Sequence, residues 1–166
     1  MESTTDMAVA PVRKSIAVKA TPQRAFEVFT ADFDSWWPRT HHIGKSPMKR
    51  GIIEEKQGDR CYTEQIDGTD CDWGTVLVWE PPTRLVIAWQ INTDWTFQPD
   101  LAKSSEVEVR FSAEPGGLTR VDLEHRLLER HGAGAGTMRS AIDSEGGWGS
   151  VLKEFAARVS KEESLH

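Results

Sequence analysis

Hydrophobic and polar residues alternate strictly in two consecutive segments, 105–114 and 118–127. The apolar positions of these segments, which share one face, are Val107, Val109, Phe111, Val121, Leu123, His125 and Leu127. The positions between them in the second segment are charged and should face water. Gly116-Gly117 separates the two segments and favours a tight turn. The pattern therefore predicts an antiparallel hairpin with one apolar face.

Five further segments have the alternation or the apolar content of β-strands. They are residues 13–19, 51–55, 61–66, 71–79 and 85–91. Asp67-Gly68 marks a turn between the third and fourth of these segments. Residues 92–104 are polar and predict a loop. Together with the hairpin, the segments predict an antiparallel sheet of about seven strands.

Two short helices are expected after the first strand. Thr21-Pro22 has the sequence of a helix start, and an apolar stripe at helical spacing follows it at Ala25, Phe26, Val28 and Phe29. A second helix is expected from Asp32, and Pro38 should end it. That second helix would carry Phe33, Trp36 and Trp37.

The C-terminal region predicts a long helix with one apolar stripe, made of Trp148, Val151, Leu152, Phe155 and Val159. We expect it to begin near Thr137 and to kink at the glycines around residue 147. The predicted fold class is therefore α+β. A curved antiparallel sheet wraps around this helix, and a tapered space remains between them.

Charge and composition narrow the range of functions. Lys and Arg total 20 and Asp and Glu total 26, so the net charge is −6. This balance argues against nucleic acid and anionic membranes as partners. No apolar run reaches the roughly 20 residues of a membrane-spanning helix, and residues 1–12 lack the pattern of a signal peptide. We expect a cytoplasmic protein with a flexible tail over residues 1–12.

Cys61 and Cys71 are expected to be free thiols. With a two-residue turn at Asp67-Gly68 they fall on opposite faces of the hairpin, and with a turn one residue longer they lie too far apart along the strands. Neither these cysteines nor the adjacent His41 and His42 have the spacing of metal ligands. No metal or other cofactor is predicted.

The chain resembles the START-like SRPBCC superfamily, and within it the homologues of the heat-shock-protein-90 ATPase activator. The resemblance covers about residues 13–160. It is carried by GTVLVWEPP (74–82), RLVIAW (84–89), EVEV (106–109), LEH (123–125) and, most typically, GWGSVL (147–152). It implies a helix-grip fold with a deep cavity between the sheet and the C-terminal helix. A single domain over residues 13–160 would follow, with residues 161–166 as a tail.

Residues on the inward face should line this cavity. Strand parity and helical spacing place there Trp36, Trp37, Trp73, Leu77, Trp79, Leu85, Ile87, Trp89, Val109, Phe111, Leu123, His125, Trp148, Leu152 and Phe155. Adjacent residues of a helix point about 100° apart. Of Trp36 and Trp37 we therefore expect one to pack in the core and the other to face the cavity mouth.

His125 allows two hypotheses. It is either a hydrogen-bonded core histidine or the residue that orients a ligand or acts as an acid or base, with Glu64 or Asp72 as companions.

We expect the cavity to bind a small hydrophobic or aromatic molecule. Two alternatives remain open. One is a cyclase- or hydrolase-like enzyme that uses the same cavity with His125 as the acid or base. The other is a chaperone-cofactor-like interaction module with a protein partner or a homodimer, in which Trp95 and Phe97 of the long loop would form an exposed apolar patch.

Overall fold

The computed structural model describes residues 9–39, 41, 43, 45–144 and 146–164. Its strands are β1 (Val12–Val18), β2 (Met48–Ile53), β3 (Arg60–Gln65), β4 (Asp70–Glu80), β5 (Arg84–Trp89), β6 (Ser105–Glu114) and β7 (Leu118–Arg126). Its helices are α2 (Pro22–Thr30), α3 (Ala135–Asp143) and α4 (Trp148–Ser164). Short 3-10 turns occur at η1 (Phe33–Ser35), η2 (Leu101–Lys103) and η3 (Leu128–His131).

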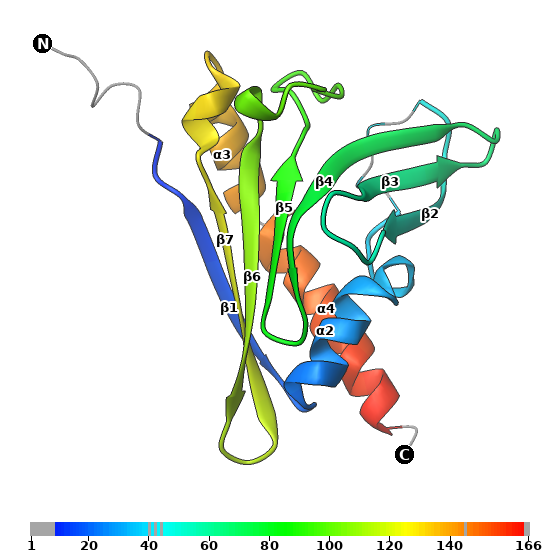
Figure 1. Ribbon diagram of the computed structural model, residues 1–166, viewed down its shortest axis with the longest axis vertical. Helices are drawn as coiled ribbons and strands as arrows, with labels where there is room; N and C mark the ends of the chain where they lie inside the picture. Colours follow the sequence, from blue (N-terminus) through cyan, green and yellow to red (C-terminus); the bar gives the residue numbers. More distant parts are fainter. Residues whose placement is uncertain (1–8, 40, 42, 44, 145, 165–166) are drawn as a thin grey trace, which may run out of the picture.

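The seven strands form one sheet in the order β1-β7-β6-β5-β4-β3-β2. Every neighbouring pair is antiparallel. Figure 1 shows that the sheet curls and that α4 runs along its inner side. The predicted fold class, a curved antiparallel sheet of about seven strands around a long C-terminal helix, is confirmed.

The sheet bends at β4. The register of β4 shifts once against β3, between Cys61 and Tyr62, and once against β5, between Val76 and Val78. Such bulges bend a strand and increase its twist, and Figure 1 shows β4 arching from β5 toward β3. Gly74 lies between the two shifts, where a Cβ atom would come within 2.6 Å of the Ala88 carbonyl oxygen. Glycine therefore allows β5 to approach β4 at the bend.

The concave face of the sheet is covered by helices with the predicted apolar stripes. In α4, the five predicted stripe residues are each at most 5% exposed. In α2, the four stripe residues are buried as well, and the hydroxyl of Thr21 caps the helix by accepting a hydrogen bond of 3.1 Å from the Arg24 amide. The rings of Phe29 and Phe155 meet at 5.3 Å and join the two helices. None of the described helices has the length and apolar character needed to span a bilayer.

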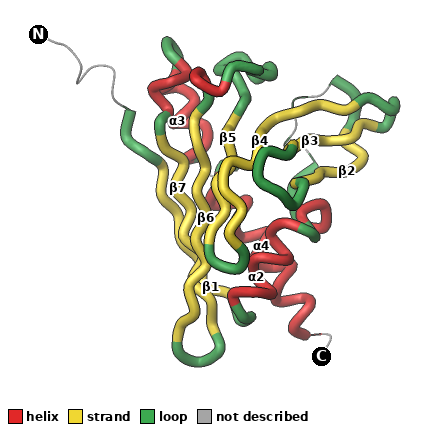
Figure 2. Tube along the Cα trace, viewed as in Figure 1, coloured by secondary structure: helices red, strands yellow, loops and turns green. Residues whose placement is uncertain are grey.

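Two helix predictions were wrong in detail. The second short helix is only the three-residue turn η1, and Trp36 and Trp37 follow it. The closing helix does not kink but breaks into α3 and α4, as Figure 2 shows. Gly147 permits the break, because a Cβ atom at this position would collide with the backbone of Ile142 at 2.0 Å.

Several boundaries also differ from the expectation. β1 begins at Val12, the last residue of the expected N-terminal tail. α4 continues to Ser164 and so extends into the expected tail of residues 161–166. Residues 1–8 and 165–166 lie outside the described part of the chain.

The hairpin of β3 and β4 has the longer of the two turns considered. The Gln65 amide donates to the Thr69 carbonyl at 2.8 Å, so the loop consists of residues 66–68. Gly68 has φ +90°, which favours glycine. Cys61 and Cys71 are both free, as predicted.

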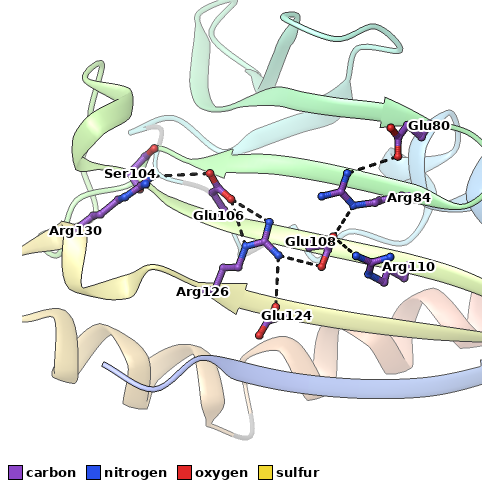
Figure 3. A network of polar contacts seen from close by, with 9 residues as sticks. All are labelled: Glu80, Arg84, Ser104, Glu106, Glu108, Arg110, Glu124, Arg126 and Arg130. Carbon is purple, nitrogen blue, oxygen red and sulfur yellow. Dashed lines mark hydrogen bonds and ion pairs between the residues drawn. The ribbon is translucent and has the colours of Figure 1, made fainter. Parts of the chain in front are cut away.

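A network of charged side chains lies on the convex face of β6 and β7 and includes Arg84 of β5, as Figure 3 shows. Glu108 is at the centre of this network, and its side chain is only 8% exposed. It accepts from Arg84 at 2.5 Å and from Arg126 at 3.0 Å, and Arg110 lies 3.1 Å away. Burial alone would raise the pKa of Glu108, but the bond from Arg84 and the charges of Arg126 and Arg110 outweigh it and lower this pKa.

Replacing Glu108 with Gln should lower the free energy of unfolding by about 1–3 kcal/mol, because three guanidinium groups lose a buried anion. Glu80 pairs with Arg84 from a side chain that is 58% exposed. Glu80→Gln is therefore a matched control that should cost less than about 0.5 kcal/mol. Urea denaturation of both variants measures the difference. Equal losses would contradict a central role for Glu108.

Candidate functional site

A cavity of about 310 Å³ lies between the sheet, the junction of α3 and α4, and the segment that follows β5. β4 and β5 contribute Trp73 and Trp89, and α4 contributes Trp148 and Val151. The remaining lining residues are Trp37, His41, Ile43, Ile91, Trp95, Ala141, Ile142, Gly146 and Gly147. At the helix break, Gly146 and Gly147 therefore contribute backbone to the cavity lining, to which the sheet contributes aromatic side chains.

Four predicted ligand-binding residues come together at this cavity, namely Trp37, Trp73, Trp89 and Trp148. The rings of Trp37 and Trp73 are parallel within 5°, with centroids 5.9 Å apart. Trp89 meets Trp148 at 5.6 Å and 63°. The four rings thus combine one parallel pair with one edge-to-face pair.

The other predicted residues on the inward face lie deeper or elsewhere. Ile87 lines a second cavity of about 10 Å³, which is about the space for a single water. Trp36, Leu85, Val109, Phe111, Leu123, Leu152 and Phe155 are buried in the core. Trp79 packs against the core from a half-buried position. Leu77 is half-buried and belongs neither to the core cluster nor to the lining of either cavity.

Trp36 and Trp37 separate where η1 ends. The indole N–H of Trp36 donates to the Val28 carbonyl at 2.8 Å, which fixes this ring in the core. The indole N–H of Trp37 donates to the His41 carbonyl at 2.7 Å, and its ring lines the cavity. Each ring therefore has a backbone acceptor that sets its direction.

Trp95 is a lining residue that the sequence indicated only as part of an exposed patch. Its backbone has φ +65°, the left-handed region that side chains rarely adopt. Its amide donates to the Asn92 carbonyl at 2.8 Å, inside a turn closed by the bridge between Ile91 and Phe97. The indole is 46% exposed and also lines the cavity, so this turn places it at the mouth.

His125 does not line the cavity. It is completely buried, and its ring contacts those of Trp89 at 5.1 Å and Trp148 at 6.0 Å. Its Nδ1 accepts from the Trp148 indole at 3.0 Å, and its Nε2 is 2.7 Å from the Ser105 hydroxyl. Burial, assisted by the neighbouring His131, lowers the pKa of His125 to about 3. The imidazole is therefore neutral near pH 7 and uses both nitrogens within the protein.

The companions considered for His125 face elsewhere. Glu64 accepts two hydrogen bonds from Arg50, and Asp72 is paired with Arg60. His41 lies at the cavity, with its Nε2 2.9 Å from the Gly146 carbonyl oxygen. His42 lies outside the described residues. Among the described residues, no group of three or more His, Cys, Asp or Glu side chains could hold a metal ion.

Comparison with known proteins adds a family and two informative structures. A family model described as "Activator of Hsp90 ATPase homolog 1-like protein" matches residues 19–160. The solved structure of an anthrahydroquino-gamma-pyrone synthase, Txn09, is 39% identical, with coverage of 91% of this chain and 97% of that one and a TM-score of 0.64. CalC, a self-sacrificing resistance protein from Micromonospora echinospora, is 28% identical, with coverages of 92% and 95% and a TM-score of 0.65.

More distant structures show the fold alone. A protein from Nitrosomonas europaea is 12% identical, with coverage of 92% of this chain and 95% of that one, yet it has a TM-score of 0.64. No curated protein matches the chain.

The buried His125 predicts a specific pH dependence of stability. Because its pKa is about 3 in the folded protein and 6.5 when unfolded, the unfolded chain binds more protons between these values. The contribution of His125 to the free energy of unfolding is therefore complete above pH 6.5. Well below this pH it falls by about 1.4 kcal/mol per pH unit. His125→Gln replaces the imidazole with an amide that can still donate and accept hydrogen bonds but does not titrate. Urea unfolding at pH 7 to 5 should therefore show a shallower dependence of the free energy of unfolding on pH. Carboxylates are common to both proteins, and equal slopes would contradict the prediction.

Proposed function

Because the chain belongs to the family of activator of Hsp90 ATPase homolog 1-like proteins, whose fold can enclose a ligand, we propose that it binds a flat aromatic molecule in its cavity. One observation carries the proposal: five of the seven tryptophans line the same cavity. The volume of the cavity, about 310 Å³, is at the lower end of the usual range for small-molecule sites.

The chemistry of the lining defines the ligand further. Among the described lining residues there is no Asp, Glu, Lys or Arg, so an uncharged ligand fits best. The indole N–H groups of Trp73 and Trp89 are buried without a hydrogen-bond partner in the described part of the chain. Unsatisfied donors of this kind cost about 1–3 kcal/mol each. A ligand carbonyl oxygen would recover part of that cost if ligand binding rotated either ring so that its N–H faced the cavity.

The 39% identical relative is named for an anthrahydroquinone-type product, and a polycyclic quinone meets both conditions. We therefore propose an anthraquinone-like polyketide as the ligand class. Burying about 300 Å² of such a ligand would contribute of the order of 7 kcal/mol before the cost of association. Because about 7 kcal/mol corresponds to a dissociation constant of about 10 μM before that cost is subtracted, an affinity between about 10 μM and the millimolar range is expected.

A second candidate function is ring closure of the bound polyketide, which the identity to a synthase favours. Forming a gamma-pyrone from a phenol and a neighbouring 1,3-diketone side chain makes one C–O bond and releases one water. Among the described lining residues, His41 is the one titratable side chain. Catalysis would then depend mainly on holding the reacting groups together and excluding water, with His41 as the group able to move the phenol proton.

The interaction-module alternative has less support. Trp95, Phe97 and Leu101 are exposed near one another in sequence, but Trp95 also belongs to the cavity wall. Its exposed indole is therefore accounted for by the entrance to a small-molecule site.

Equilibrium dialysis with anthraquinone and anthracene tests the binding proposal, because the two share three rings and differ in two carbonyl oxygens. We expect anthraquinone to bind about tenfold more tightly, the value of roughly one hydrogen bond. Trp73→Phe and Trp89→Phe should each reduce this preference. Trp79→Phe is the matched control, since Trp79 packs outside the cavity. Failure of anthraquinone to bind, or equal preferences in all proteins, would contradict the proposal.

Mass spectrometry of an anthraquinone with a phenol and a 1,3-diketone side chain tests the second candidate. A catalyst should accelerate loss of one water over the spontaneous reaction, and His41→Phe should reduce the acceleration. A product that forms equally fast with and without the protein would contradict ring closure and leave binding as the function.

A further inference from the structure

A chain of hydrogen bonds connects four side chains behind the cavity wall. The Trp148 indole nitrogen is 3.0 Å from His125 Nδ1. His125 Nε2 is 2.7 Å from the Ser105 hydroxyl oxygen, which is also 2.7 Å from His131 Nε2. Ser105 and His125 are completely buried. His131 comes from η3, immediately before the segment that leads to α3.

The donor and acceptor roles in this series of hydrogen bonds follow from the Trp148 indole. An indole nitrogen can only donate, so His125 Nδ1 must be the acceptor. A neutral imidazole carries one proton, which then lies on Nε2 and is donated to the Ser105 oxygen. The remaining hydroxyl proton of Ser105 can be donated to His131 Nε2. His131 consequently carries its own proton on Nδ1.

This arrangement leaves one uncompensated group. His131 Nδ1 is buried without a hydrogen-bond partner in the described part of the chain. An apolar side chain at this position would avoid that cost. We take the fixed orientation of the Trp148 indole to be the gain that offsets the cost of the unpartnered His131 Nδ1.

Trp148 needs such a constraint. It is the first residue of α4 and lies between Gly147 and Gly149, so its backbone neighbours contribute no side chains. Its ring is a wall of both cavities and contacts those of Trp37 at 6.1 Å and Trp89 at 5.6 Å. A rotation of this indole would change the shape of the site on both sides.

We propose that Ser105 and His131 are positioning residues of the cavity, which hold His125 as the Nε2–H tautomer so that its Nδ1 fixes the indole of Trp148. The hydrogen-bond arrangement stands independently of the ligand, whereas its effect on affinity rests on the proposed binding function. Neither residue touches the cavity, and both act through His125.

Nitrogen-15 NMR of the imidazole rings in the wild-type protein near pH 7 tests the direction without any substitution. We expect His125 to be protonated at Nε2 and His131 at Nδ1. A His131 ring protonated at Nε2, or a His125 ring protonated at Nδ1, would overturn the proposal.

The effect on the wall is tested with Ser105→Ala. The indole N–H resonance of Trp148, assigned by its loss in Trp148→Phe, should shift to the position of a weaker hydrogen bond. Affinity for anthraquinone should fall about fivefold to tenfold. Thr119→Val is the matched control, because Thr119 is completely buried in the same sheet and its hydroxyl donates to the Ala20 carbonyl at 2.7 Å. This control should leave both the resonance and the affinity unchanged.

The outcomes separate this proposal from the binding function. An unchanged Trp148 resonance in Ser105→Ala, or an equal shift in Thr119→Val, would overturn the positioning role. If the expected tautomers and shift are found but wild-type protein does not bind anthraquinone, the positioning chain is supported and the proposed ligand class is wrong.

Discussion

The structure depends on a mismatch of widths between a sheet and the helix that covers it. Seven strands at a spacing of about 4.8 Å form a surface roughly 30 Å wide, whereas one helix with its side chains is about 10 Å across. The curl at β4 narrows the difference but does not remove it. α2 and α3 cover further parts of the inner face, and the cavity lies between the sheet and the junction of α3 and α4.

Tryptophan suits this geometry because its side chain is the largest apolar one and carries its own donor. Rings from β4, β5, α4 and the segment after η1 reach across the uncovered part of the sheet and meet edge to face or in parallel. The polar positions behind them are equally specific. The Trp148 ring faces the cavity on one side and is bonded to a buried polar chain on the other. The apolar lining of the cavity and the buried hydrogen-bond network are thus joined through Trp148.

Period-two alternation predicted the sheet because each strand of a one-sided sheet must separate its apolar and polar residues. Helical spacing predicted the α4 stripe, and the two patterns together placed four cavity tryptophans on the inner face. Strand alternation, however, shows which face a side chain is on and not how far it lies from the cavity. It placed His125 on the inner face but could not show that Trp89 and Trp148 lie between it and the cavity. Ser105 and His131 escaped notice because their contacts depend on strand register and on the course of η3.

The order of elements along the chain has a consequence for biosynthesis. β1 is hydrogen-bonded to β7, with most of the chain between them, and α4 follows every strand. A ribosome delivers the chain from its N-terminus, so the sheet emerges before the helix that shields its oily side. If the sheet forms as it emerges, its tryptophan-bearing inner face stays exposed until translation reaches the last helix, and chaperones can engage it during that interval.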